Sequence, residues 1–176
     1  YFYAPTSVQN EAEAAAALAR LGSSNAPASA AEATARAEGL FKAKRYADSF
    51  AACQDAAGRF PETQNAQAQL RRGVAAFNAR RAPETVQSLT NVPTGAGQTR
   101  AEALNYLTQH YARAKQWDMA RSTIEEMRRA FPKSDWTKRA LASAEQSAED
   151  AKNTADALTF ARAAVTLFPG EPEVAG

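Results

Sequence analysis

The sequence predicts an all-α fold, built as a solenoid of about four helical hairpins with one further helix in front of them. Four segments align without internal gaps, and the equivalent residues Ala37, Gly73, Thr108 and Glu145 are 36, 35 and 37 positions apart. Self-similarity at a period of about 20 to 50 residues is typical of repeat proteins. Each unit combines a small residue in one helix, a turn, and an apolar stripe that ends at proline. The aligned segments are residues 36–61, 72–93, 108–132 and 145–169.

The first element expected is a helix from about Val8 to Leu21, which is rich in alanine and ends before Gly22. Residues 22–29 then form a short linker of small and turn-forming residues. We therefore divide the chain into an N-terminal helix and linker, residues 1–29, and a superhelical domain, residues 30–176.

Capping signals locate the helices that follow. Ser29 with Glu32, and Thr99 with Glu102, have the spacing of capping boxes, in which a hydroxyl and a carboxylate satisfy free amides at a helix start. These pairs predict helix starts near residues 30 and 100. The other helices are expected at about 46–59, 63–79, 83–91, 117–131, 135–151 and 154–168.

Proline and small residues indicate how these helices end and pack. Pro61, Pro132 and Pro169 each follow a phenylalanine, and proline cannot continue a helix. Small side chains let two helix backbones approach closely, while large apolar ones fill the space between hairpins. The small residues are Gly73, Ala120 and Ala157, and the large ones are Tyr46, Leu107 and Trp117.

The third unit resembles the tetratricopeptide repeat (TPR) family, and the other units match it more weakly over about residues 30–169. Phe131, Pro132 and Ser134 make the resemblance closest to the bacterial envelope type of this family. The resemblance implies a right-handed superhelix whose first helices line a concave groove. The matching residues of the third unit are Leu104, Leu107, Tyr111, Trp117, Ala120, Ile124, Met127 and Pro132.

By this resemblance, the groove is expected to bind a partner as an extended or helical peptide. Phe41 and Phe77 are its best anchors, although the same rings could instead pack between hairpins. The candidate groove residues are Phe41, Lys42, Leu70, Val74, Phe77, Asn78, Asn105, Gln109 and Arg113.

Composition limits the other function classes. The 21 basic and 19 acidic residues give a net charge of +2 and are interspersed, which favours neither nucleic acid nor an anionic membrane surface as a partner. Cys53 is the one cysteine and is expected to be a small buried hydrophobe, and His110 is the one histidine, expected to be half-buried and hydrogen-bonded. No glycine-rich phosphate loop occurs. We therefore expect no catalytic residue, metal or cofactor.

The leading hypothesis is a non-enzymatic adaptor, a subunit of a larger assembly that binds a protein partner through the groove or an edge. The alternative is the superhelical region of a peptidoglycan-cleaving transglycosylase, whose catalytic domain would lie beyond Gly176. The sequence begins at Tyr1 and has no apolar run of the roughly 18 residues that span a bilayer, so we expect no membrane insertion by this chain. An anchor before Tyr1 would suit a bacterial periplasmic or membrane-associated location.

Overall fold

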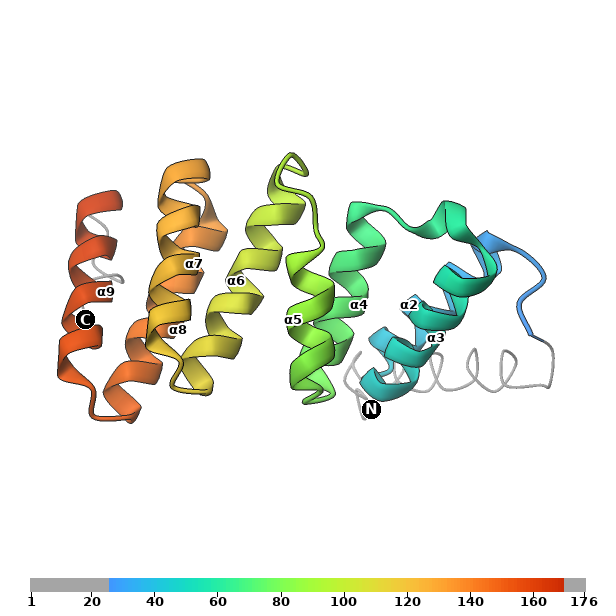
Figure 1. Cartoon of the computed structure of the whole chain (residues 1–176), viewed down its shortest axis with the longest axis horizontal. Coiled ribbons are helices and arrows are strands. Elements are labelled where there is room, and N and C mark those ends of the chain that lie inside the picture. The colour runs from blue at the N-terminus through green and yellow to red at the C-terminus, as the bar shows by residue number, and fades with distance from the viewer. Residues whose placement is uncertain (1–25, 170–176) are drawn as a thin grey trace, which may run out of the picture.

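The computed structural model of the chain describes residues 26–169 as a single row of helices (Figure 1). Within this range the chain forms eight α-helices and one short 3-10 helix, and it forms no strand. The elements are α2 (Ala30–Lys42), α3 (Tyr46–Arg59), η1 (Pro61–Thr63), α4 (Ala66–Asn78), α5 (Ala82–Thr90), α6 (Gln98–Arg113), α7 (Trp117–Ala130), α8 (Asp135–Asp150) and α9 (Thr154–Leu167).

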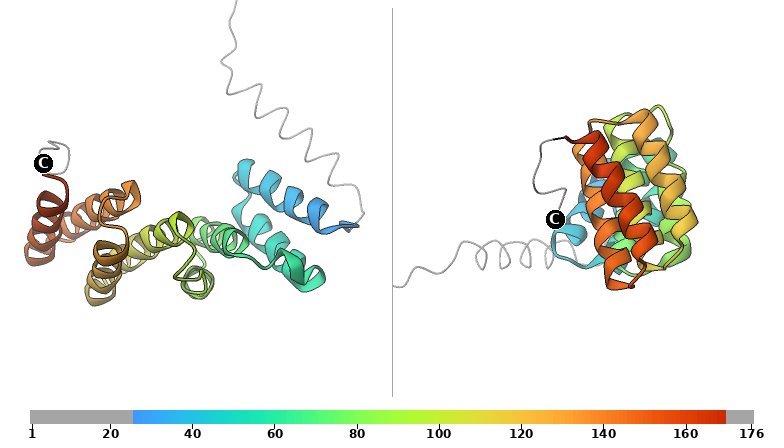
Figure 2. Two further views of the ribbon diagram at one scale, coloured as in Figure 1. Left: turned by 90° about the horizontal axis from the view of Figure 1, so that it is seen from above. Right: turned by 90° about the vertical axis from the view of Figure 1, so that its left-hand side faces the viewer.

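The helices pair into hairpins that stack one after another. The pairs are α2 with α3, α4 with α5, α6 with α7 and α8 with α9, and further contacts of α3 with α4, α4 with α6 and α6 with α8 join successive hairpins. Figure 2 shows the hairpins following one another along the long axis. The prediction of an all-α solenoid of helical hairpins is confirmed. The helix expected at residues 8–21 lies outside the described residues.

Most helix boundaries agree with the sequence prediction to within two residues. The predicted helix at 63–79 is the main difference: Pro61 begins the 3-10 turn η1, and α4 begins only at Ala66, where the Asn65 side chain accepts a hydrogen bond of 2.9 Å from the amide of Ala68. Phe60, Phe131 and Phe168 are the C-terminal caps of α3, α7 and α9. The prolines that follow them therefore stop these helices as predicted.

The first predicted capping box is present in altered form, because Glu32 bonds the amide of Ala28, one residue before the N-cap Ser29. The Ser29 hydroxyl accepts a hydrogen bond of 3.2 Å from the amide of Glu32, and the Glu32 carboxylate accepts one of 2.8 Å from the amide of Ala28. The prediction for Thr99 and Glu102 is wrong. The N-cap of α6 is Gly97, whose φ of 58° suits glycine, so Thr99 already lies within the first helical turn.

The four turns inside the hairpins have the same backbone geometry. Lys44, Arg80, Lys115 and Lys152 have φ between 57° and 58°, a left-handed conformation that glycine usually adopts. The residue after each donates its amide to a carbonyl five positions earlier, as in the bond of 2.9 Å from Arg45 to Leu40 and that of 2.8 Å from Gln116 to Tyr111. These are Schellman motifs. In Figure 1 the turns lie along the lower edge of the solenoid.

A continuous apolar core runs through the second, third and fourth hairpins. Its largest fully buried side chains include Leu89, Leu104, Met127, Leu141 and Phe160. The close approach expected at small residues is confirmed at Gly73, where an added Cβ atom would lie 2.4 Å from Cδ2 of Leu89 on the paired helix. Ala120 and Ala157 are also buried, whereas Tyr46 and Trp117 are only partly buried.

Candidate functional site

The strongest candidate for a binding surface is the face on which α2, α4 and α6 present aromatic rings and arginines together. At its first end the half-buried ring of Phe41 meets Tyr46 edge to face, with 5.3 Å between ring centroids. The guanidinium of Arg71, from α4, lies 4.9 Å from the centroid of the Phe41 ring. An amino group of Arg71 also lies 3.7 Å from the Glu38 carboxylate, so Arg71 joins the first hairpin to the second.

One hairpin further along, Phe77 also meets a tyrosine and an arginine, but here both come from α6 of the next hairpin. The half-buried ring of Phe77 meets Tyr106 of α6 edge to face, with centroids 5.3 Å apart. The exposed side chain of Arg113, also from α6, places its guanidinium 4.8 Å from the Phe77 ring centroid. We call this surface the aromatic–arginine face. Its members are Phe41, Tyr46, Arg71, Phe77, Tyr106 and Arg113.

Electrostatic interactions link the two halves of this face. Partial burial, reinforced by the charge of Glu102, raises the pKa of the Tyr106 hydroxyl, and the positive charges of Arg139 and Arg71 act in the opposite direction. Burial likewise raises the pKa of the Glu102 carboxyl, and the same two arginines oppose this shift. The face is thus a partly dehydrated surface of mixed charge, in which a carboxylate lies close to two arginines.

The residues predicted for the groove divide between this face and the core. Phe41, Phe77 and Arg113 belong to the face, and Lys42 and Asn78 are exposed beside it. Leu70, Val74 and Asn105 are buried, so they present no open surface. Gln109 is half-buried, and its amide donates a hydrogen bond of 3.3 Å to the Asn105 side chain.

Sequence reasoning missed Arg71 and Tyr106, the residues directly after the buried Leu70 and Asn105. Successive residues on a helix point about 100° apart, so an error of one position moves a residue from the surface into the core. A usable signal was present. Arg71 and Tyr106 are 35 positions apart, and thus equivalent in the repeat.

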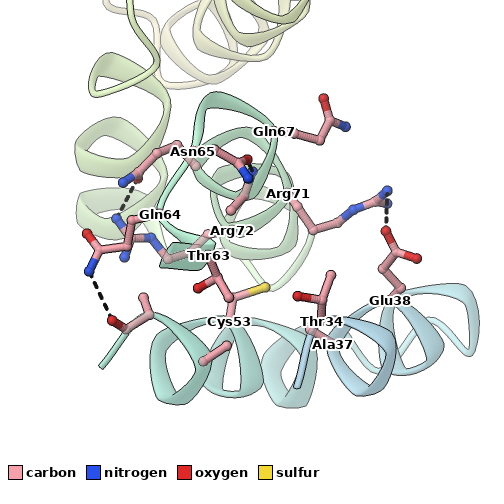
Figure 3. A pocket seen from close by; sticks show the side chains of 14 residues that line it. Thr34, Ala37, Glu38, Cys53, Thr63, Gln64, Asn65, Gln67, Arg71 and Arg72 are labelled. Atoms are coloured by element: carbon pink, nitrogen blue, oxygen red, sulfur yellow. Dashed lines mark hydrogen bonds and ion pairs between the residues drawn. The ribbon is translucent and has the colours of Figure 1, made fainter. Parts of the chain in front are cut away.

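A separate pocket of 160 Å³ lies between the first hairpin and the start of α4 (Figure 3). Alanines and polar side chains line it together, and the Cys53 sulfur points into it. Cys53, expected to be a small buried hydrophobe, is partly buried, because the space in front of it is not filled by a neighbouring side chain. Burial nevertheless raises the pKa of the Cys53 thiol, although Arg71 and Arg72 act in the opposite direction.

His110 is half-buried as expected, and its ring meets that of Tyr111 at 5.5 Å between centroids. Burial lowers the pKa of the imidazole and so favours its neutral form. The expected hydrogen bond is not formed with any described residue. Between residues 26 and 169, no three side chains of histidine, cysteine, aspartate or glutamate converge to hold a metal ion. In the same range, no helix combines the length and the apolar character that crossing a bilayer requires.

The sequence matches no model of a known protein family, and it matches no curated protein.

Proposed function

We propose that the chain is a non-enzymatic scaffold that binds a protein partner through the aromatic–arginine face. The observation that carries this proposal is the pairing of a half-buried phenylalanine with an arginine at both Phe41 and Phe77. A guanidinium stacked on a ring keeps its N–H edge available for carbonyl or carboxylate groups, while the ring supplies apolar contact area. Aromatic residues and arginine are the types that most often dominate binding energy at protein interfaces.

We also propose that the repeat is TPR-like, with the first helices of successive hairpins forming the binding surface. Arg71 and Tyr106 lie on α4 and α6, the first helices of successive hairpins, and these helices contact each other directly. A peptide that follows the solenoid axis would meet Phe41 with Arg71 first and Phe77 with Arg113 next. An extended or helical segment bearing both apolar and acidic side chains fits this order best.

The experiment compares capture of partners from the native source by the immobilised chain and by two double variants. Arg71→Gln with Arg113→Gln removes the stacked cations but keeps both rings, and we expect it to weaken capture while leaving the melting temperature nearly unchanged. Phe41→Ala with Phe77→Ala removes the rings. The control is Leu158→Ala with Val165→Ala, which truncates two apolar side chains of α9 that are 48% and 50% exposed.

The outcomes separate recognition from packing. Reduced capture by the arginine variant, with an unchanged melt and a fully active control, supports the proposal. Full capture by both the arginine and the phenylalanine variants would refute it. If only the phenylalanine variant loses capture and it also melts much earlier, the rings pack the hairpins together and the face does not bind.

A further inference from the structure

The turns inside the four hairpins carry a row of basic side chains that the proposed scaffold function does not use. Lys44, Arg80, Lys115 and Lys152 occupy equivalent positions of the repeat, and all four are exposed. None of them forms an ion pair within residues 26–169. We call these four residues the basic turn row.

Basic residues near these turns that do form ion pairs are neutralised locally. Arg45 lies 2.7 Å from the Asp48 carboxylate, and Arg81 lies 2.8 Å from that of Glu84. Arg121 pairs with both Asp118 and Asp156. The near-zero net charge of the whole chain thus includes four basic side chains at the turns that form no ion pair within residues 26–169, with the exposed carboxylates of Glu149 and Asp150 beside Lys152.

The fold itself does not require lysine or arginine at these positions. A left-handed turn residue is most easily glycine, and any other side chain adds conformational strain. Helix C-termini attract positive charge because their last carbonyl groups lack partners. Here the Schellman bonds already supply partners, such as the amide of Asn153, which donates to Ala148 at 2.8 Å. Four strained positions thus carry basic side chains without a clear structural need.

We propose that the basic turn row binds the anionic surface of a phospholipid bilayer, by electrostatic contact and without insertion. The turns lie at a similar level on the lower side of the solenoid in Figure 1, so one flat surface could meet them together. Each basic side chain held near anionic headgroups strengthens binding by roughly fivefold, so four act together by several hundredfold. The aromatic–arginine face adjoins the row at two turns, because Tyr46 and Arg113 are two residues from Lys44 and Lys115.

A flexible nucleic acid is the competing ligand, and the structure favours it less. Single-stranded nucleic acids bind where bases stack on exposed aromatic side chains between the basic residues. The aromatic residues next to the row are all half-buried, and they are Phe41, Tyr46, Phe77 and Trp117. Phe77 packs against Tyr106. Tyr46 packs against Phe41, and Trp117 packs against the core.

The test measures co-sedimentation of the full chain with vesicles of phosphatidylglycerol and phosphatidylcholine in equal parts, and with vesicles of phosphatidylcholine alone. We expect binding to the anionic vesicles only, with affinity falling steeply as salt is added because surface charges are screened. Replacing Lys44, Arg80, Lys115 and Lys152 together with glycine should weaken this binding by roughly several hundredfold. The same four positions changed to glutamine serve as a second variant if the glycine protein does not fold.

A matched control removes four positive charges from elsewhere by changing Arg128, Arg129, Lys133 and Arg162 to glutamine. We expect this variant to bind anionic vesicles within a few-fold of the unchanged chain. Equal binding to both vesicle types, no binding at low salt, or the same loss in the control and row variants would each overturn the proposal. Binding of a single-stranded oligonucleotide through the same four residues, without vesicle binding, would also overturn it and identify a polyanion as the ligand.

Discussion

Arg100 of α6 and Glu126 of α7 form a partly buried ion pair that links the two helices of the third hairpin, and this pair lies beside the end of α5 in the second hairpin. An amino group of Arg100 lies 2.8 Å from the Glu126 carboxylate, and the Arg100 side chain is only 9% exposed. The other amino group donates to the carbonyls of Val92 at 2.9 Å and Thr90 at 3.2 Å. Arg100 thus satisfies backbone groups at the end of α5 that no helical amide can reach.

Replacing Arg100 with methionine should lower the free energy of unfolding by about 2–4 kcal/mol, because buried carbonyls and the Glu126 carboxylate lose their partner. The control is Arg129→Met, since Arg129 is 75% exposed and its ion pair with Glu125 lies in solvent. That change should alter stability by less than about 0.5 kcal/mol. Urea midpoints measure both, and equal effects would contradict the bridging role.

The close packing of α4 on α5 makes Gly73 sensitive to a single methyl group. In Gly73→Ala the new Cβ atom would lie 2.4 Å from Cδ2 and 2.5 Å from Cγ of Leu89, a residue with no exposed surface. We expect a loss of about 1–3 kcal/mol, because neither helix can yield without disturbing the core.

The matched control for this prediction is Gly58→Ala. An added Cβ atom at Gly58, within α3, meets no atom within 4 Å. That substitution should stabilise the chain by about 0.5–1 kcal/mol, because alanine favours the helix more than glycine does. Thermal melting separates the two, and a Gly73→Ala protein as stable as the Gly58→Ala protein would refute the close contact.

Replacing a strained turn residue with glycine should raise the stability of the chain, whereas replacing a helical residue with glycine should lower it. Lys44→Gly should raise stability by about 0.5–1 kcal/mol, because glycine adopts positive φ without the clash of a Cβ atom. Lys42→Gly, two positions earlier in the last turn of α2, should lower stability by a similar amount, roughly 0.5–1 kcal/mol. Denaturant unfolding of the two variants measures the difference, and a loss of stability in both would show that Lys44 has a structural role that we have not identified.

The fold was largely predictable because the same pattern of packing residues occurs in four successive units. Prolines at helix ends, small residues and the period of 35 to 37 residues indicated where the hairpins lie. The structural features that the sequence did not predict depend on contacts between individual residues. Ser49 is a polar residue that is fully buried, and its hydroxyl donates a hydrogen bond of 2.8 Å to the carbonyl of Ala37.

The candidate site was less predictable because it depends on helix rotation and on contacts between hairpins. The sequence identified Phe41 and Phe77, and in the structure each ring is half-buried against a tyrosine and also meets an arginine. The stacking arginines could not be assigned from one unit. Arg71 and Arg113 lie in α4 and α6, and each reaches a ring on a preceding hairpin.

The half-buried thiol of Cys53 gives a prediction that depends on pH. Burial raises the pKa of Cys53, with the charges of Arg71 and Arg72 offsetting only part of the effect. Because the thiolate is the reactive form, alkylation of Cys53 by iodoacetamide should be slower than that of glutathione at neutral pH. The midpoint of its pH–rate profile should also lie at higher pH.

The raised pKa of Cys53 also affects the free energy of unfolding, because the thiol keeps its proton to higher pH in the folded state than in the unfolded state. The free energy of unfolding should therefore be unaffected below the ordinary pKa of a thiol and decline as pH rises through the folded pKa. In Cys53→Ala this part of the decline should be absent. Alkylation in denaturant is the internal control, because unfolding should return the profile to that of glutathione. If the pH–rate profile of the folded chain has its midpoint at or below the pH found for glutathione, the charges of Arg71 and Arg72 lower the pKa of Cys53 more than burial raises it.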